Sequence, residues 1–503
     1  MPFMSSLRFV WWSAALAIGG CSAILGDDFR IADDAATSGA GGNAGGTAQG
    51  ASGPGGGSSL SLAHEWSMSF GDPDEQYATA LAVDGNDQVV VGGYFRGVLE
   101  IGGDTLVWAG QVNDAFVAKF SPAGEALWAR RYGSTDFYAI TAVTDLAIDA
   151  AGNIYASGTF RTPVDFGAST GPLVADSEAD GFLLKLNPNG ATEWSIAWPN
   201  VGHGIPTAVA LTPSGVVLAG VFDGQMDLGG GMLVAQGAAD AFVASFDASG
   251  NHVASRRFGI SGATDARDVA VDDMGNVFVL GNFDGSVDFG GTTLTNAGAS
   301  DIFLAGFDAQ LVHRFSHGYG TSGIESGQSL AIRGGSLVMA GSAGGPIDFG
   351  TGALPHGGSY DALLVELDTS GNHVRSYAAG DADGQHASGV IIEPDGSVLG
   401  AGSMRGAMSW QGVDLQAAGR FPIEDVWLAR LDVPFAANYG DEFPQPSETQ
   451  PGPLSGYPAL ASSPDGGIVM VGEFDGTIDF GGGPLVGQGE SDFFVTKLRW
   501  AQK

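Results

Sequence analysis

Short apolar runs separated by polar turns fill the chain from residue 61 to its end. In the stretch 265–320, DARDVAVD alternates apolar and polar residues, NVFVLGNF and DIFLAGFD are almost continuously apolar, and a fourth run covers 312–319. Runs of this length, bounded by Gly, Asp and Asn and without a helical period, predict an all-β fold. The runs that do not alternate predict strands covered on both faces by neighbouring sheets.

The same unit recurs seven times along the chain. An Asp opens an apolar run such as DAFVAKF at intervals of 60 to 67 residues. These residues are Asp114, Asp180, Asp240, Asp301, Asp361, Asp425 and Asp492. Four-stranded units repeated in this way predict a seven-bladed β-propeller with four strands per blade, because radial repetition leaves only short, protected sheet edges.

The frame of the repeat predicts how the ring closes. A copy of the fourth strand, EWSMSFG at 65–71, precedes the first complete unit, whereas the last unit ends at LRWAQK without one. Counting the leading copy gives seven of each of the four strand types. We therefore expect the N-terminal strand 65–71 to complete the blade that the C-terminal residues begin.

The repeated pieces also carry a family resemblance. The Gly-Asn turn and the G-x-F, V-D-F-G-G and D-x-F-V-x-K-F pieces resemble the bacterial seven-bladed β-propeller repeat (SBBP repeat) family over about 61–500. The resemblance implies exported propellers of mostly undetermined activity, so it supports the fold and says little about function. The units around 330–350 and 402–412 depart from the pattern, and we expect irregular blades there.

The N-terminus has the pattern of an export signal. Arg8 precedes an apolar stretch at 9–18 that is too short to span a bilayer. The run Ile18-Gly19-Gly20-Cys21 resembles the bacterial lipobox, which implies cleavage after residue 20 and lipidation of Cys21; an ordinary secretory signal with an accidental Cys is the alternative. We divide the chain into a signal peptide (1–20), a flexible Gly/Ala/Ser-rich linker (21–60) and the propeller (61–503). The expected location is a bacterial membrane, at the outer membrane or cell surface.

Composition removes several classes of function. The chain has 56 Asp and Glu against 20 Lys and Arg, a net charge of −36, and a single Cys. Nucleic-acid binders need a basic surface that releases counterions, so we expect no nucleic-acid partner. One Cys excludes an intramolecular disulfide framework and a Cys-based zinc cluster. The expected partners are the membrane, through the lipid anchor, and an unidentified protein or glycan.

The recurrent Asp residues raise the question of calcium. Because an Asp returns once per unit beside Gly, we interpret it as a turn residue whose carboxylate accepts backbone N–H bonds. Asp381-Ala-Asp383-Gly384 is the piece nearest to a calcium loop, and it lacks the rest of that motif. We expect no cofactor. The pieces FSPAGEALW (120–128) and LNPNGATEW (186–194) loosely resemble the Trp-docking repeat of quinoprotein propellers, and we interpret their Trp residues as blade packing.

Candidate binding residues lie in the long connections. The turns after first and third strands are tight, whereas the other connections are long and share the opposite face, and variable loops on a rigid scaffold often carry function. The candidates are Phe137, Tyr138, Asp383, His386, Tyr439 and Tyr457. We expect a binding or scaffold module without enzymatic activity. The alternative is a cell-surface carbohydrate-active enzyme, a glycosidase or lyase, with carboxylates in the channel. Buried channel carboxylates would favour the enzyme, and exposed loop aromatics would favour binding.

Overall fold

The computed structural model describes residues 60–110, 112–169, 171–175, 179–198, 200–410, 413–416, 425–432, 436–443, 458–474, 476–489 and 491–502. Every regular element in these ranges is a β-strand, so the predicted all-β fold is confirmed. None of the described residues forms a helix with the length and hydrophobicity needed to cross a membrane. Cys21 and Tyr457 lie outside the described residues.

Seven antiparallel four-stranded sheets, numbered here in chain order, make up the body. Sheet 1 contains β2 (Gln76–Val83), β3 (Val89–Phe95), β6 (Asp114–Phe120) and β7 (Ala126–Tyr132). Sheet 2 contains β8 (Thr141–Ile148), β9 (Ile154–Phe160), β10 (Asp180–Leu186) and β11 (Thr192–Ala197). Sheet 3 contains β13 (Gly204–Thr212), β14 (Gly215–Phe222), β17 (Asp240–Asp247) and β18 (His252–Phe258). Sheet 4 contains β19 (Thr264–Val271), β20 (Val277–Phe283), β23 (Asp301–Phe307) and β24 (His313–Tyr319).

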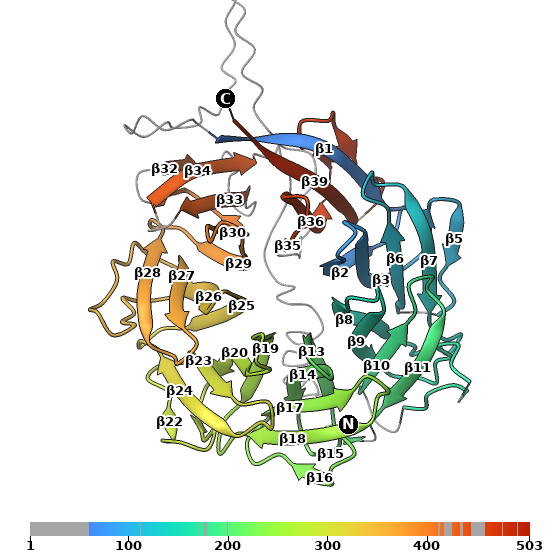
Figure 1. Cartoon of the computed structure of the whole chain (residues 1–503), viewed down its shortest axis with the longest axis horizontal. Coiled ribbons are helices and arrows are strands. Elements are labelled where there is room, and N and C mark those ends of the chain that lie inside the picture. The colour runs from blue at the N-terminus through green and yellow to red at the C-terminus, as the bar shows by residue number, and fades with distance from the viewer. Residues whose placement is uncertain are drawn as a thin grey trace, which may run out of the picture.

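Sheet 5 contains β25 (Glu325–Arg333), β26 (Ser336–Ala343), β27 (Asp361–Asp368) and β28 (His373–Ala379). Sheet 6 contains β29 (Gln385–Ile392), β30 (Val398–Met404), β33 (Asp425–Asp432) and β34 (Ala436–Phe443). Sheet 7 contains β35 (Ala459–Ser462), β36 (Gly467–Phe474), β39 (Asp492–Gln502) and β1 (Leu60–Phe70). Figure 1 shows the sheets around a common centre, with the first strand of each innermost and the fourth outermost. The fold is of the propeller type. The irregularity expected around 330–350 and 402–412 does not disturb the four-stranded order of sheets 5 and 6.

Short strands outside the sheets form the connections between second and third strands. They are β4 (Val98–Ile101) with β5 (Asp104–Val107), β15 (Gln225–Asp227) with β16 (Met232–Val234), β21 (Ser286–Val287) with β22 (Leu294–Thr295), β31 (Ala407–Trp410) with β32 (Val413–Gln416), and β37 (Thr477–Ile478) with β38 (Leu485–Val486). A further short strand, β12 (Asn200–Val201), lies between sheets 2 and 3 in the chain and pairs with β15. In sheet 1 this hairpin meets the outer strand, where Asp104 Oδ2 accepts the Ala129 N–H at 2.9 Å. Such a contact covers a sheet edge that would otherwise offer unpaired backbone groups.

The hydrophobic core lies between sheets rather than within one. Each buried cluster among the described residues combines side chains of two consecutive sheets, and one of them joins sheet 7 to sheet 1. There the rings of Phe116 and Phe493 stack with centroids 5.2 Å apart. Both faces of each sheet are therefore covered, which explains why the central strands are almost continuously apolar.

Tryptophans of the outer strands link one sheet to the next. The indole N–H of Trp66 donates to Pro122 O at 3.0 Å, and that of Trp128 donates to Pro188 O at 3.1 Å. In both cases the acceptor lies in the turn between the third and fourth strands of the following sheet. A Cβ added to Gly190 in that turn would lie 2.8 Å from the Trp128 ring, so only glycine allows this close approach. The interpretation of these tryptophans as packing residues fits this geometry.

The N-terminal strand pairs with the C-terminal one. Strand β1 runs antiparallel to β39, from Leu60 opposite Gln502 to Phe70 opposite Phe493. It begins five residues before the predicted 65–71 and ends one residue earlier. Gly71 follows it because a Cβ there would lie 2.0 Å from the Asp492 carboxylate.

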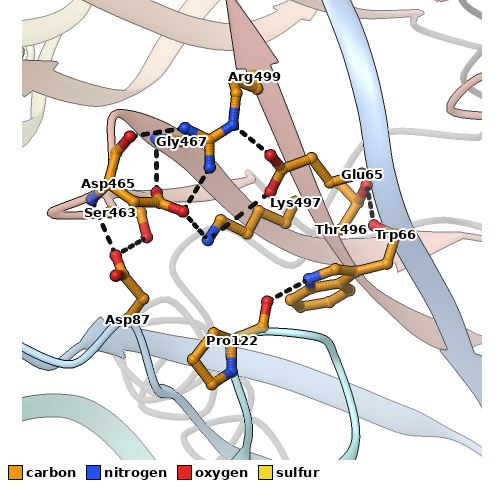
Figure 2. A network of polar contacts seen from close by, with 10 residues as sticks. All are labelled: Glu65, Trp66, Asp87, Pro122, Ser463, Asp465, Gly467, Thr496, Lys497 and Arg499. Atoms are coloured by element: carbon orange, nitrogen blue, oxygen red, sulfur yellow. Dashed lines mark hydrogen bonds and ion pairs between the residues drawn. The ribbon is translucent and has the colours of Figure 1, made fainter.

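Figure 2 shows the polar network that joins the two chain ends, which we call the terminal network. Asp465, in the turn before β36, accepts bonds from Lys497 Nζ at 2.8 Å and from Arg499 of β39. Arg499 also pairs with Glu65 of β1, and Lys497 Nζ lies 3.7 Å from Glu65 Oε2. The Asp465 N–H donates to Asp87 of sheet 1 at 2.9 Å. The network therefore connects the N-terminal and C-terminal strands of the chain, β1 and β39, to each other and to sheet 1.

Candidate functional site

Phe137 and Tyr138 form an exposed aromatic pair in the loop between β7 and β8. Their side chains are 65% and 63% exposed, and their rings meet edge to face with centroids 5.0 Å apart. The Arg161 guanidinium lies 5.7 Å from the centre of the Tyr138 ring, within the range of a cation–π interaction. The pair thus offers a largely solvent-facing aromatic surface with a cation at its side.

Backbone bonds hold this loop in place. The Asn113 N–H donates to Ala139 O at 3.4 Å, and the Thr141 N–H donates to Asn113 O at 3.1 Å. The Asn113 side chain donates to Thr141 O at 3.0 Å, and the Arg161 N–H donates to Ile140 O at 2.9 Å. Since the residues that follow the aromatic pair are fixed on both sides, a ligand would meet a surface that needs little ordering.

The second predicted cluster, Asp383 and His386, is divided between loop and strand. Asp383 is exposed, and its N–H donates to Asp381 Oδ1 at 2.9 Å. His386 lies on β29 against Tyr360, with ring centroids 5.2 Å apart. Burial, with the nearby Arg405 charge, lowers the pKa of His386 to about 4, so its ring is neutral at pH 7.

The predicted residues do not gather in one site. Strands β8 and β29, which follow the two loops, lie on different sides of the centre in Figure 1. Tyr439 lies within β34, paired in register with Arg430 of β33, rather than in a loop. The prediction that Tyr439 lies in a long connection is therefore wrong, because residues 436–443 form the fourth strand of sheet 6.

The centre of the body holds a cavity of about 580 Å³, lined by residues from the inner strands of all seven sheets. Two of its lining residues, Asp145 of β8 and Asp268 of β19, are half-buried acids that we call the channel carboxylates. Burial raises the pKa of Asp145 to about 7, with a contribution from the Asp268 charge. Burial likewise raises the pKa of Asp268 to about 7, against the effect of its hydrogen bonds.

Both oxygens of each channel carboxylate accept backbone bonds. Asp145 Oδ2 accepts the Val209 N–H of the next sheet at 2.7 Å, and Oδ1 accepts the Leu146 N–H at 2.8 Å. Asp268 does the same with Leu330 of the next sheet and with Val269, both at 2.7 Å. The carboxylates therefore tether neighbouring sheets at the channel wall. Neither residue was among the predicted candidates, although an acid in place of the Ala or Gly common at this strand position was a readable signal.

The recurrent Asp residues also bind backbone groups of the protein. Asp114, which opens β6, accepts the Ala109 N–H at 2.9 Å and pairs with Arg131 Nη1 at 2.6 Å. In the tight turns, Asp149 Oδ1 accepts the Ala151 and Asn153 N–H groups, both at 2.9 Å. This is the structural role expected from the sequence. Among the residues that the structure describes, no group of three or more His, Cys, Asp or Glu side chains is placed to hold a metal ion.

Comparison with known proteins adds little to this geometry. No family model matches the chain, and no curated protein matches it. Among solved structures, the periplasmic gluconolactonase PpgL of Pseudomonas aeruginosa shares 10% identity at a TM-score of 0.38, covering 82% of this chain and 99% of that one. Sqt1 from Chaetomium thermophilum shares 11% identity at a TM-score of 0.38, covering 88% and 100%. The Synechocystis apocarotenoid oxygenase shares 9% at 0.36, covering 90% and 97%. At such scores none of them bears on function, and the chain is an all-β protein of the propeller type.

Proposed function

We propose that this chain is an exported lipoprotein whose propeller binds a glycan or protein partner without catalysing a reaction. The observation that carries the proposal is the exposed, anchored aromatic pair, Phe137 and Tyr138. Exposing two large rings to water is unfavourable, since burying a side chain of this size is worth about 1.5–3 kcal/mol. A partner that covers the rings recovers this free energy, and the adjacent Arg161 supplies a polar contact at the edge.

Acids in the channel with a raised pKa would by themselves favour the enzyme alternative, but the hydrogen bonds of the channel carboxylates argue against it. A glycosidase needs one carboxyl group to donate a proton and another to act as base or nucleophile on the substrate. Here all four oxygens of Asp145 and Asp268 accept backbone N–H groups. An acid that tethers two sheets is not oriented toward a substrate, so we assign the channel carboxylates a structural role.

We further propose that the seven sheets are the blades of a seven-bladed ring closed by β1. Two observations support this: β1 pairs with β39 along its length, and one core cluster joins sheet 7 to sheet 1. Closure between the two chain ends makes the ring one cooperative unit and removes a free sheet edge.

The lipid anchor is the remaining part of the proposal, and it rests on the lipobox-like run before Cys21. Cys21→Ser removes the thiol that would be acylated. We expect the wild-type chain to partition with the membrane and detergent phase in a bacterial host, and the variant to leave it. Unchanged partitioning of the variant would refute lipidation at this residue.

The binding role is tested on the full chain with a glycan array and a cell-surface pull-down, each performed with three proteins. The double variant Phe137→Ala and Tyr138→Ala should lose at least tenfold in affinity for any ligand that wild type retains. The matched control, Leu127→Ala and Val253→Ala, truncates apolar side chains on outer strands that are 48% and 59% exposed. If the control loses binding and the loop variant does not, the aromatic pair is not the binding surface.

A further inference from the structure

A recurring distortion of the inner strands shapes the central cavity. In six of the seven inner strands the pairing with the second strand shifts by one residue at the same place, which is the mark of a β-bulge. The skipped residues are all polar: Thr79, Thr144, Thr207, Arg267, Gln328 and Ser388. All six line the cavity, and we call them the bulge ring.

Half of the bulge ring is held by hydroxyl bonds from sheet to sheet. Thr79 Oγ1 donates to Val143 O at 2.7 Å, Thr144 Oγ1 to Pro206 O at 2.8 Å, and Thr207 Oγ1 to Ala266 O at 2.8 Å. A hydroxyl that donates its proton still accepts through its oxygen lone pairs. The three threonines therefore present hydroxyl oxygens whose donors are already engaged.

Three charged groups near the bulge ring, Arg267 and the channel carboxylates, are bonded inside the protein, and Arg333 and Glu473 also line the cavity. Arg267 Nη2 lies 2.5 Å from Asp265 Oδ2, and the channel carboxylates accept backbone N–H groups as described above. The hydroxyl of Ser388, by contrast, is buried without a hydrogen-bond partner among the described residues. Of the six residues of the bulge ring, only Arg267 carries a charge.

Beyond the bulge ring most lining residues are apolar, and the exceptions are Asp145, Asp268, Ser329, Arg333 and Ser462. Each inner strand begins at the face where one sheet connects to the next and ends in a turn at the opposite face, so equal positions lie at equal depth. The residues after the bulges include Leu81, Val271, Ile332, Ile391 and Leu460, all of which line the cavity. Three strand residues extend over roughly 10 Å, so this apolar band is deep enough for a short alkyl or aryl group.

We propose that the central cavity binds a small neutral amphiphile, with its hydroxyl groups at the bulge ring and its apolar part in the band below. The volume of about 580 Å³ lies within the range of small-molecule sites. The net charge of −36 disfavours anions by long-range repulsion. Because five of the six bulge-ring residues are neutral and Arg267 is paired with Asp265, hydroxyl recognition is the main polar contact at the ring, as an alkyl or aryl glycoside would require. This site is separate from the aromatic pair.

The test uses hexyl glucoside as the probe and the full chain carrying Cys21→Ser, so that no lipid or detergent is needed. Calorimetry should show binding of hexyl glucoside, with glucose and hexanoate each at least tenfold weaker. Gln328→Trp, which fills the bulge ring, should reduce affinity at least tenfold. Leu127→Trp, at an exposed position on β7, should change it less than twofold, and so should the double alanine variant of the aromatic pair.

A second measurement keeps the test independent of how the variants fold. Hydrogen–deuterium exchange of the parent chain should show hexyl glucoside protecting amides of β2 and β25 and leaving those of 133–140 unchanged. Hexanoate binding as tightly as hexyl glucoside, protection confined to 133–140, or full affinity in a folded Gln328→Trp protein would each overturn the proposal. None of these outcomes bears on whether the aromatic pair binds a partner, so the two proposals fail separately.

Discussion

Removing Asp465 from the terminal network tests how strongly the two chain ends are held together. This carboxylate accepts Lys497 Nζ at 2.8 Å, the Gly467 N–H at 2.9 Å and a bond from Arg499. Although its partial burial alone would raise the pKa of Asp465, the bonds from Lys497, Gly467 and Arg499 hold it well below its usual range. The carboxylate is therefore charged at pH 7 and pairs with a Lys497 side chain that is only 1% exposed.

Because the Lys497 side chain is buried and the Asp465 side chain is partly exposed, we expect the two single substitutions to lower the free energy of unfolding by different amounts. Asp465→Ala leaves the buried Lys497 ammonium with Glu65 at 3.7 Å as its remaining carboxylate. Removing one partner of a buried ion pair costs about 3–5 kcal/mol of stability. Because Glu65 still lies near Lys497, we expect a loss at the lower end of this range, about 3 kcal/mol. Lys497→Met removes the buried charge itself and leaves Asp465 bonded to Arg499 and Gly467, so the expected loss is about 1 kcal/mol or less. The double variant should be more stable than Asp465→Ala alone.

Urea unfolding of the full chain measures all four proteins of this cycle, with thermal unfolding as a second readout. At about 2 cal/mol/K per residue, a chain of this length has an unfolding entropy near 1 kcal/mol/K, so Asp465→Ala should lower Tm by roughly 3 °C. Equal losses in the two single variants, or a double variant less stable than Asp465→Ala, would refute the assignment of Lys497 as a buried charge that depends on Asp465.

Three further predictions concern the channel carboxylates, two glycines and β1. Burial raises the pKa of both channel carboxylates to about 7, well above the value in an unfolded chain, so their contribution to stability is greatest below pH 4 and is lost as pH rises to 7. Tm should therefore fall between pH 5 and pH 8. Replacing both residues with Asn should make Tm less dependent on pH over this range. Gly133→Ala would place a Cβ 2.0 Å from the Asp114 carboxylate and should cost several kcal/mol, about 3 or more. Gly85→Ala meets no atom within 4 Å and should stay within about 0.5 kcal/mol in the same urea titration. Deleting 60–70 exposes the edge of β39 and should cause aggregation or a sharply lower Tm in light scattering and calorimetry, whereas a deletion variant that melts like the full chain would contradict closure by β1.

The strand pattern and the repeat could be read from the sequence because both depend on local properties. Apolar runs such as DIFLAGFD give β-strands wherever they occur, and Asp beside Gly or Asn gives tight turns through its own neighbours in the chain. The pairing of β1 with β39 also followed, since the count of strand types left one place open at each end. The exposure of Phe137 and Tyr138 was predictable for the same reason: a loop between two strands has no buried face of its own.

Contacts between sheets could not be predicted from the sequence, because they join residues about one repeat unit apart in the chain. The resemblance between units does not reveal that Asp145 reaches Val209, or that Thr79 donates to Val143 O. Asp383 and His386 are three residues apart in the chain, yet the Asp383 side chain is exposed and the His386 ring lies against Tyr360. Strand β29 begins between them, and a strand turns successive residues to alternate faces.

The sequence by itself therefore determined the kind of elements and their number per unit, since these follow from hydrophobic period and turn chemistry. The expectation of long connections was correct between second and third strands but wrong before β2, β19, β25 and β29, each of which follows a connection of five residues. Tertiary structure alone decided which polar residues line the cavity, because a bulge places Thr79 and its counterparts there only when the sheets are packed around a centre. It also decided the environment of each acid. Asp145 and Asp465 are the same residue type, but burial raises the pKa of one while neighbouring cations lower that of the other, and both effects depend on what lies nearby in space.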